Sequence, residues 1–245
     1  MRSERVDVSL VVTFHNEGLY AHSTLNSIER CCNYSRMNGV SVECVFVLDS
    51  VDDETKNVFY RHSIVKKSAI VVEVESGDVG AARNIGIKKA AGSAVAILDG
   101  DDYYSKNWIE RAWNSLSEYG DKAIIHPECM VTFGNHREYC WQVDQSDKLF
   151  SKDGLLVYNY WSSWTFARRN VYISHPYGET RPLETGFGYE DWHWNCEMVA
   201  KGYEHRLAPG TVGFYRRKAN NSLAASSIAA GAIIKPSSLF AWRAV

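Results

Sequence analysis

Three aspartates stand close together in LDGDD, residues 98–102, directly after a short apolar run. Carboxylates held this close repel one another unless a cation lies between them. Oxygen ligands suit a hard divalent ion, Mg²⁺ or Mn²⁺, which can bridge a diphosphate and stabilise its charge as it leaves. We expect such an ion at Asp99 and Asp101. The structural alternative is that Asp99 and Asp102 cap the turn and the next helix.

The segment before these aspartates, GDVGAARNIGIKKAAG, adds Asp78 and Arg83. Arg83 can make a forked contact with phosphate oxygens or a base carbonyl, although a lone arginine is more often a surface charge of a helix. Gly77 and Gly80 allow the backbone to turn tightly into that helix. No G-x-G-x-x-G pattern of dinucleotide enzymes follows the first predicted strand.

A second acidic pair, Glu190 and Asp191, lies in GYEDWHW just before a predicted helix. Sugar transfer with inversion needs one base to accept the proton of the acceptor hydroxyl. A carboxylate serves if it stays ionised, which a helix N-terminus favours. The alternative is ordinary capping, because acidic residues are common in a first helical turn.

The elements that must position these residues follow from the hydrophobic pattern. Apolar runs of strand length alternate with helical patterns in the first half, which indicates an α/β fold with a mostly parallel sheet and helices on both faces. In such sheets, ligands bind beyond the carboxyl ends of the strands. The predicted strands are 6–14, 42–48, 69–74 and 94–98, and the predicted helices are 18–32, 53–62, 80–91 (with Gly92 as its C-terminal cap) and 108–119.

The second half is less regular and reads as a mixed region that completes the same domain. We expect one domain over 1–222, with a donor-binding half (1–120) and an acceptor-binding half (121–222). The apolar, Ala-rich segment at its end predicts a helical extension, 223–245, which packs on the core, contacts a membrane surface or leads into a further region. The predicted elements are strands 123–133, 139–143, 164–168, 203–207 and 212–215, and helix 191–201.

Composition excludes several classes of function. A net charge of -2 provides no basic field for nucleic acid. The six cysteines form no C-x-x-C pair, which argues against structural zinc and is typical of reduced thiols in the cytoplasm. No apolar stretch is long enough to span a membrane, so we expect a cytoplasmic protein, with peripheral contact at the inner membrane face. The 8 Trp and 14 Tyr either line a carbohydrate site or fill the core.

The succession VSLVVTFHNE, VFVLDSVDDET, ESGDVGAARNIGIKKAAGSAVAILDGDD and GYEDWHW resembles glycosyltransferase family 2, of the GT-A fold, over about residues 6–222. The resemblance implies inverting transfer of a sugar from a nucleotide-diphosphate donor, a UDP-sugar, to a glycan, lipid-linked glycan or protein. It implies Asp101 as the direct metal ligand, with Asp99 beside it, and Asp191 as the base. The implied acceptor contacts are Glu190 and Trp192, and the implied donor contacts are Thr13, His15, Glu17, Asp49, Asp78, Arg83, Asp99 and Lys218.

The chain departs from the family pattern at three places. His15 takes the place of an aromatic residue, where it can stack on a pyrimidine, and Leu48 replaces the first of two adjacent aspartates, leaving Asp49. Lys218 stands where the family often has a metal-binding histidine. A protonated lysine cannot bind a metal ion but can neutralise the leaving diphosphate, unless Arg216, Arg217 and Lys218 form only a solvated loop. His193 and His205 are alternative ligands, if they are not simply packed or surface residues.

Two other functions fit parts of the pattern. One is a non-catalytic module that binds a nucleotide or a glycan inside a larger assembly. The other is nucleotidyl transfer to a sugar phosphate, a class that usually has a glycine-rich, basic loop after the first strand. The corresponding segment here, HNEGLY, contains no Arg or Lys, which argues against the second alternative.

Overall fold

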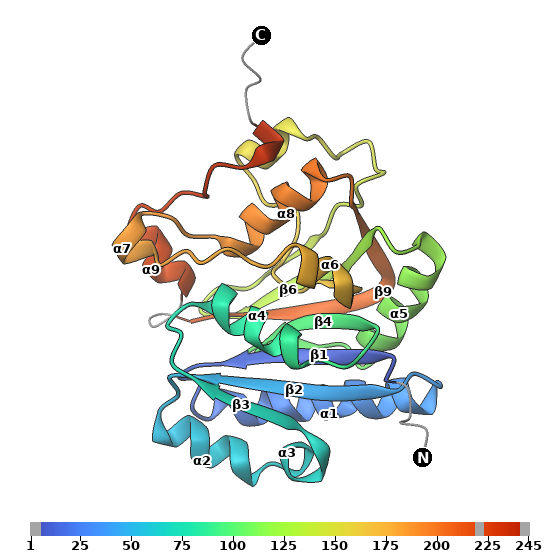
Figure 1. Ribbon diagram of the computed structural model, residues 1–245, viewed down its shortest axis with the longest axis vertical. Coiled ribbons are helices and arrows are strands. Elements are labelled where there is room, and N and C mark those ends of the chain that lie inside the picture. Colours follow the sequence, from blue (N-terminus) through green and yellow to red (C-terminus); the bar gives the residue numbers. More distant parts are fainter. Residues whose placement is uncertain (1–5, 219–222, 241–245) are drawn as a thin grey trace.

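The structure is a computed structural model that describes residues 6–218 and 223–240. Within these ranges, nine strands form one sheet in the order β3-β2-β1-β4-β8-β6-β9-β5, with β7 paired to β6. The first four are mutually parallel and confirm the predicted α/β architecture (Figure 1). They are β1 (Val8–Phe14), β2 (Val42–Asp49), β3 (Ile70–Val74) and β4 (Ala94–Asp99).

Helices cover both faces of this parallel part. Because successive strand residues point to opposite faces, Leu10 and Val12 of β1 belong to a core with α1, α2 and α5, whereas Val11 belongs to a second core with α4 and α8. Figure 1 shows α1, α2 and α3 on one side of β1–β3 and α4 on the other. The helices are α1 (Tyr20–Met37), α2 (Asp53–Arg61), α3 (Ser63–Ser68), α4 (Val79–Lys89), α5 (Trp108–Tyr119) and α8 (Glu190–Ala200).

The second half is a mixed sheet joined to the first by one antiparallel pairing, β4 with β8. Strand β6 runs parallel to β9 and antiparallel to β7 and β8, while β5 pairs antiparallel with β9. The long β6–β9 ladder carries the end of β9 back toward the carboxyl end of β4. These strands are β5 (Tyr103–Tyr104), β6 (Ala123–Gly134), β7 (Glu138–Trp141), β8 (Phe166–Arg168) and β9 (Glu204–Arg217).

The C-terminal segment packs on the second half. Ser237 and Ser238 donate hydrogen bonds to Glu197 of α8, and Ile233 forms a parallel bridge with Phe187. The expected domain boundary at residue 222, and the last residues of the expected extension, lie outside the described ranges. The remaining short elements are η1 (Asp153–Leu156), α6 (Arg169–Ser174), α7 (Pro182–Thr185), α9 (Leu223–Ala229) and η2 (Ser238–Phe240).

Three sequence-based expectations about elements are wrong. Helix α4 ends at Lys89 with Ala90 as its cap, and Gly92 instead allows close approach, since a Cβ there would lie 2.6 Å from the Ser9 nitrogen. The two strands predicted around Pro209 and Gly210 are one strand, β9, because a register shift against β6 absorbs the extra residues as a bulge. Within residues 223–240, the expected helical extension is helical only over α9 and the short η2, with a non-helical stretch between them.

The aromatic residues divide between core and surface. Trp108, Trp164 and Trp194 are fully buried and fill the core, whereas Tyr139 and Trp141 are exposed. All six cysteines are free, and five of them are buried. No described helix combines the length and the apolar character needed to cross a membrane.

The contact of α4 with the sheet generates a prediction. A Cβ at Gly86 would lie 2.5 Å from Val11 Cγ1 and 2.9 Å from Val47 Cγ2. We expect Gly86→Ala to lower the free energy of unfolding by about 1–3 kcal/mol, because overpacking outweighs the ~1 kcal/mol that alanine gains in a helix. Urea unfolding measures the change. The matched control is Gly178→Ala, whose added Cβ would meet nothing nearer than 3.9 Å; equal midpoints for the two variants would contradict this packing.

Candidate active site

The predicted site residues gather at the carboxyl ends of the parallel strands. In the sheet register Thr13 lies opposite Asp99, and Phe14 lies opposite Leu48, so the loops after β1, β2 and β4 start side by side. Thr13, Asp49 and Arg83 are buried, whereas His15 is exposed. The sequence therefore predicted correctly that these loops converge at one edge.

Arg83 is the buried cation of the site. Its Nη2 lies 2.8 Å from Asp99 Oδ1 and its Nη1 lies 2.6 Å from Glu190 Oε1. Burial acts to lower the pKa of Arg83, but Asp99 and Glu190 outweigh it and hold that pKa well above its ordinary value. One guanidinium on α4 thus connects the end of β4 with the start of α8. Arg83 is therefore not a surface charge, which was the alternative interpretation of the sequence. In these contacts its guanidinium is also not exposed to a phosphate group.

The three aspartates of LDGDD have different surroundings. Asp99 accepts a second hydrogen bond from Ser163 Oγ, 2.6 Å from its Oδ2. Asp101 Oδ2 is paired with Lys218 Nζ at 2.7 Å. Asp102 is fully buried, accepts hydrogen bonds from the Trp164 indole and the Arg216 backbone N–H, and does not cap the next helix, whose N-cap is Asn107. Asp102 therefore has a structural role, but it does not cap a helix as the sequence-based alternative expected.

Burial has the largest effect on the pKa values of Asp101 and Glu17, the two carboxyls near Lys218. It raises the pKa of Asp101 in spite of Lys218, and it raises the pKa of Glu17 to about 7. Burial acts to lower the pKa of Lys218, but Asp101 outweighs it and raises that pKa overall. The Lys218 ammonium therefore stays charged, and it lies close enough to affect both carboxyls. Lys218 belongs to the site and not to a solvated loop.

Asp49 and Asp78 hold the loop between β3 and α4. Asp49 accepts hydrogen bonds from the Ser76 backbone N–H at 2.8 Å and from Ser76 Oγ at 2.6 Å. Asp78 caps α4 by accepting from the Ala81 N–H at 2.8 Å, and it also accepts from the Thr180 N–H at 2.9 Å. Both carboxylates thus have protein donors in this structure, and their contact with a donor stays a prediction.

The loop after β1 is fastened to the loop after β2. His15 Nδ1 lies 2.6 Å from the Asp49 carbonyl oxygen, and Glu17 accepts a hydrogen bond of 2.5 Å from the His15 backbone N–H. Asn16 accepts from the Asp52 N–H at 2.8 Å. The exposed imidazole is held at the rim, in a position compatible with the predicted stacking on a base.

Asp191 lies in the first turn of α8, beside Glu190. It is half-buried, and burial raises its pKa to about 7, with the neighbouring Glu190 charge acting in the same direction and Arg83 opposing it. Asn159 donates a hydrogen bond of 3.3 Å to its Oδ2. The residue before the pair, Tyr189, has a left-handed backbone (φ 57°), a strained conformation that recurs at functional sites. The carboxyl of Asp191 can therefore exchange a proton near neutral pH.

Trp192 and the two alternative histidines are placed differently. Trp192 donates from its indole nitrogen to the Leu155 carbonyl oxygen at 2.9 Å, so its contact with an acceptor stays a prediction. His205 is fully buried and stacks on Trp161 with ring centroids 3.8 Å apart. His193 is half-buried near Glu197. Both histidines fit the packed alternative considered from the sequence.

Sequence reasoning missed Asn159 and Ser163. Both come from the irregular stretch between β7 and β8, where no period marks an element and no motif marks a side chain. A carboxylate buried on a strand end needs donors, but that requirement alone does not identify which polar residue supplies them.

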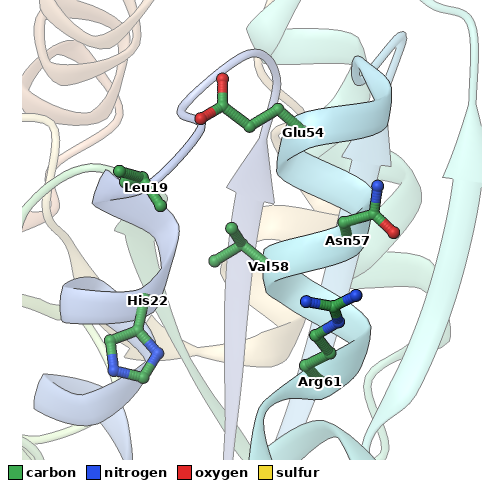
Figure 2. A pocket seen from close by; sticks show the side chains of 6 residues that line it. All are labelled: Leu19, His22, Glu54, Asn57, Val58 and Arg61. Carbon is green, nitrogen blue, oxygen red and sulfur yellow. The ribbon is translucent and has the colours of Figure 1, made fainter.

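A hollow of the surface lies away from these residues. A cavity of about 610 Å³ opens between the start of α1 and α2, as Figure 2 shows. None of the predicted site residues lines it; the lining residues are Leu19, His22, Glu54, Asn57, Val58 and Arg61. We assign the site by the convergent charged groups and not by this cavity.

The Arg83 contacts generate a second prediction. Arg83→Met leaves Asp99 and Glu190 without their shared cation, and we expect the free energy of unfolding to fall by about 3–5 kcal/mol, as when one partner of a buried pair is removed. The control is Arg181→Met, which breaks exposed pairs with Glu179 and Glu184 and should cost less than about 1 kcal/mol. Denaturant unfolding distinguishes the two variants, and a loss at Arg83 no larger than at Arg181 would contradict a structural role for this cation.

Comparison with known proteins shows which sequences this chain is similar to. A model of the family described as glycosyl transferase family 2 matches residues 9–174. Glycosyltransferase AglE of Haloferax volcanii is 30% identical over 209 residues, covering 84% of this chain and 66% of the relative. Poly(ribitol-phosphate) beta-N-acetylglucosaminyltransferase TarS of Staphylococcus aureus is 28% identical over 119 residues, 48% of this chain and 20% of the relative. The chain thus spans two thirds or less of these relatives.

Solved structures agree on the fold. The structure of S. aureus TarS 1-349 in complex with UDP-GlcNAc matches with a TM-score of 0.68 and 18% identity, covering 89% of this chain and 61% of that one. GalNAc-T7 with UDP, GalNAc and Mn²⁺ matches with a TM-score of 0.62 and 16% identity, covering 89% and 45%. The architecture is therefore that of the GT-A fold. Because the family model matches more than half of the sequence, the chain belongs to glycosyl transferase family 2.

Proposed function

We propose that this chain transfers a sugar, with inversion, from a nucleotide-diphosphate donor to a hydroxyl of a glycan, a lipid-linked glycan or a protein. One observation carries the proposal: the buried Arg83 ties Asp99, at the strand end expected to bind the donor, to Glu190, the neighbour of Asp191. A base and a donor site must lie within reach of one sugar ring, and this shared cation supports that arrangement. The AglE relative, named a glycosyltransferase, and the UDP-GlcNAc complex of TarS support the same chemistry.

In the proposed reaction, the acceptor oxygen forms a bond to the anomeric carbon while the bond from that carbon to the diphosphate breaks. The electron pair of the broken bond goes to the diphosphate oxygen. The proton of the acceptor hydroxyl goes to the Asp191 carboxylate, which must be ionised to accept it. Glu190, fixed by Arg83, supports the acceptor side. His15 at the rim and Asp49 behind it are the proposed contacts of the nucleobase, with uracil preferred.

Charge on the departing diphosphate must be compensated by a cation. The sequence predicts Mn²⁺ or Mg²⁺ at Asp99 and Asp101, and the GalNAc-T7 structure was solved with Mn²⁺. In this chain both oxygens of Asp99 accept protein donors, and Asp101 is paired with Lys218. No group of three or more His, Cys, Asp or Glu side chains among the described residues is placed to hold a metal ion. Because Arg83, Ser163 and Lys218 take three of the four oxygens of Asp99 and Asp101, these residues as placed do not fit a bound metal. The cytoplasmic location stays a prediction.

A panel of nucleotide sugars tests the function. We expect one donor, a UDP-sugar, to be hydrolysed slowly and to be consumed faster when a suitable acceptor is added; release of UDP measures both. Binding of a nucleotide with no turnover of any donor would favour the non-catalytic module instead.

The base assignment predicts the effect of Asp191→Asn. The amide is nearly isosteric but cannot accept the hydroxyl proton, so we expect kcat to fall by about 10²–10⁴-fold. Calorimetry should show UDP binding within about twofold of the unaltered chain. Glu204→Gln, at an exposed carboxyl on β9, is the control for removing one negative charge. Unchanged kcat in Asp191→Asn would rule out this base.

The same carboxyl predicts a pH profile. Because the pKa of Asp191 is about 7, kcat/KM should rise tenfold per pH unit below pH 7 and level off above it. The charged groups that act on Asp191 are Glu190 from its own helix, Arg83 from α4 and Asp99 from β4. Glu17 has a pKa of the same value, so the control is Glu17→Gln, which should keep the inflection. An inflection that disappears in Glu17→Gln would assign the titration to Glu17.

A further inference from the structure

The position beside Asp101 is already occupied by a cation of the chain itself. Lys218 Nζ lies 2.7 Å from Asp101 Oδ2, and the two side chains are only 16% and 19% exposed. A partly buried ammonium that is paired with a carboxylate at a strand end is a fixed positive charge, not a mobile surface lysine.

The backbone that leads into Lys218 is anchored at Arg216 and Arg217. Arg216 donates from Nε to the Asp101 carbonyl oxygen at 3.0 Å, and its guanidinium lies 4.1 Å from the Tyr20 ring centroid and 4.5 Å from that of Phe133. The Arg217 carbonyl accepts from the Asn135 N–H at 3.1 Å. These contacts hold the end of β9 against the β4 turn, so that the ammonium is presented in one place without reorganisation.

The carboxylates of the turn are correspondingly unsuited to a metal ion. Asp99 is paired with Arg83, which it shares with Glu190, and Asp102 accepts a hydrogen bond from the Trp164 indole inside the protein. A divalent ion at Asp101 would lie close to the Lys218 ammonium, which is paired with Oδ2 of the same carboxylate. Like charges that close repel strongly in a partly buried site. The arrangement is consistent with a single cation, already supplied by the sequence.

We infer that the Lys218 ammonium replaces the divalent cation at this turn, so that donor binding and sugar transfer proceed without a metal ion. The inference rests on the proposed function and specifies which positive charge compensates the leaving diphosphate. When the bond between the sugar and the diphosphate breaks, the electron pair goes to the diphosphate, and Lys218 stabilises that added charge while Asp101 keeps the ammonium in position. The ammonium keeps all its protons, because the acceptor proton goes to Asp191.

Calorimetric titration with UDP tests the inference without relying on turnover. We expect the unaltered chain to bind UDP with the same affinity, within about threefold, in EDTA and in MnCl₂. Lys218→Met keeps the apolar stem and removes the charge, so UDP affinity should fall about 10- to 100-fold in EDTA. Lys218→His places a neutral nitrogen ligand beside Asp101 and should recover affinity only when Mn²⁺ is present. The matched control is Lys201→Met, which breaks a pair with Glu197 at the far end of α8 and should bind UDP normally.

The outcomes separate the two proposals. UDP binding by the unaltered chain only in MnCl₂ overturns the inference and leaves the proposed function intact, as does unchanged affinity in Lys218→Met. If neither UDP nor any other nucleoside diphosphate binds with or without Mn²⁺, the proposed function fails and the inference fails with it. Since the EDTA comparison uses the unaltered chain, the test holds even if a Lys218 variant folds poorly, which circular dichroism reports.

Discussion

The rest of the site depends on a buried guanidinium that is shared between two carboxylates from distant parts of the chain. Arg83 keeps its proton, and an unpaired buried charge costs several kcal/mol, so the contacts with Asp99 and Glu190 remove a large penalty. This requirement brings the start of α8 to the end of β4, across more than ninety residues of sequence. A buried ion pair adds little net stability, but it specifies one arrangement of the elements that carry it.

With that cation in place, the remaining acids differ in what surrounds them. Asp49 and Asp78 accept several short hydrogen bonds from backbone N–H groups and hydroxyls, which makes them parts of the scaffold. Asp191 has burial and a like charge beside it, and its pKa moves to about 7. Aspartates thus have two different roles here: some hold a loop, and one can exchange a proton. Their surroundings, and not the residue type, decide which role each one has.

The sequence predicts the parallel half well, for a physical reason. Strands buried on both faces read as apolar runs, and polar residues directly after them must lie at one edge. In the second half, the elements do not follow this simple pattern of apolar runs and polar strand ends. Pro209 and Gly210 are typical of a turn, yet the β6–β9 ladder absorbs them in a bulge. Asn159 and Ser163 come from an irregular stretch whose position is set by tertiary contacts, so the sequence indicated Asp99 and Asp191 but not their donors.

At the end of β9, the fold determines where residue 218 lies but not the charge of its side chain. The ladder with β6 fixes where residue 218 lies, because Arg217 pairs with Gly134 in register and Arg216 is locked over Tyr20 and Phe133. Any side chain at position 218 is therefore delivered to the Asp101 carboxylate. A neutral histidine there would add a metal ligand, whereas lysine adds a positive charge and removes a ligand. In the proposed reaction a cation is needed next to the diphosphate, and the side chain at position 218 determines whether the protein supplies it.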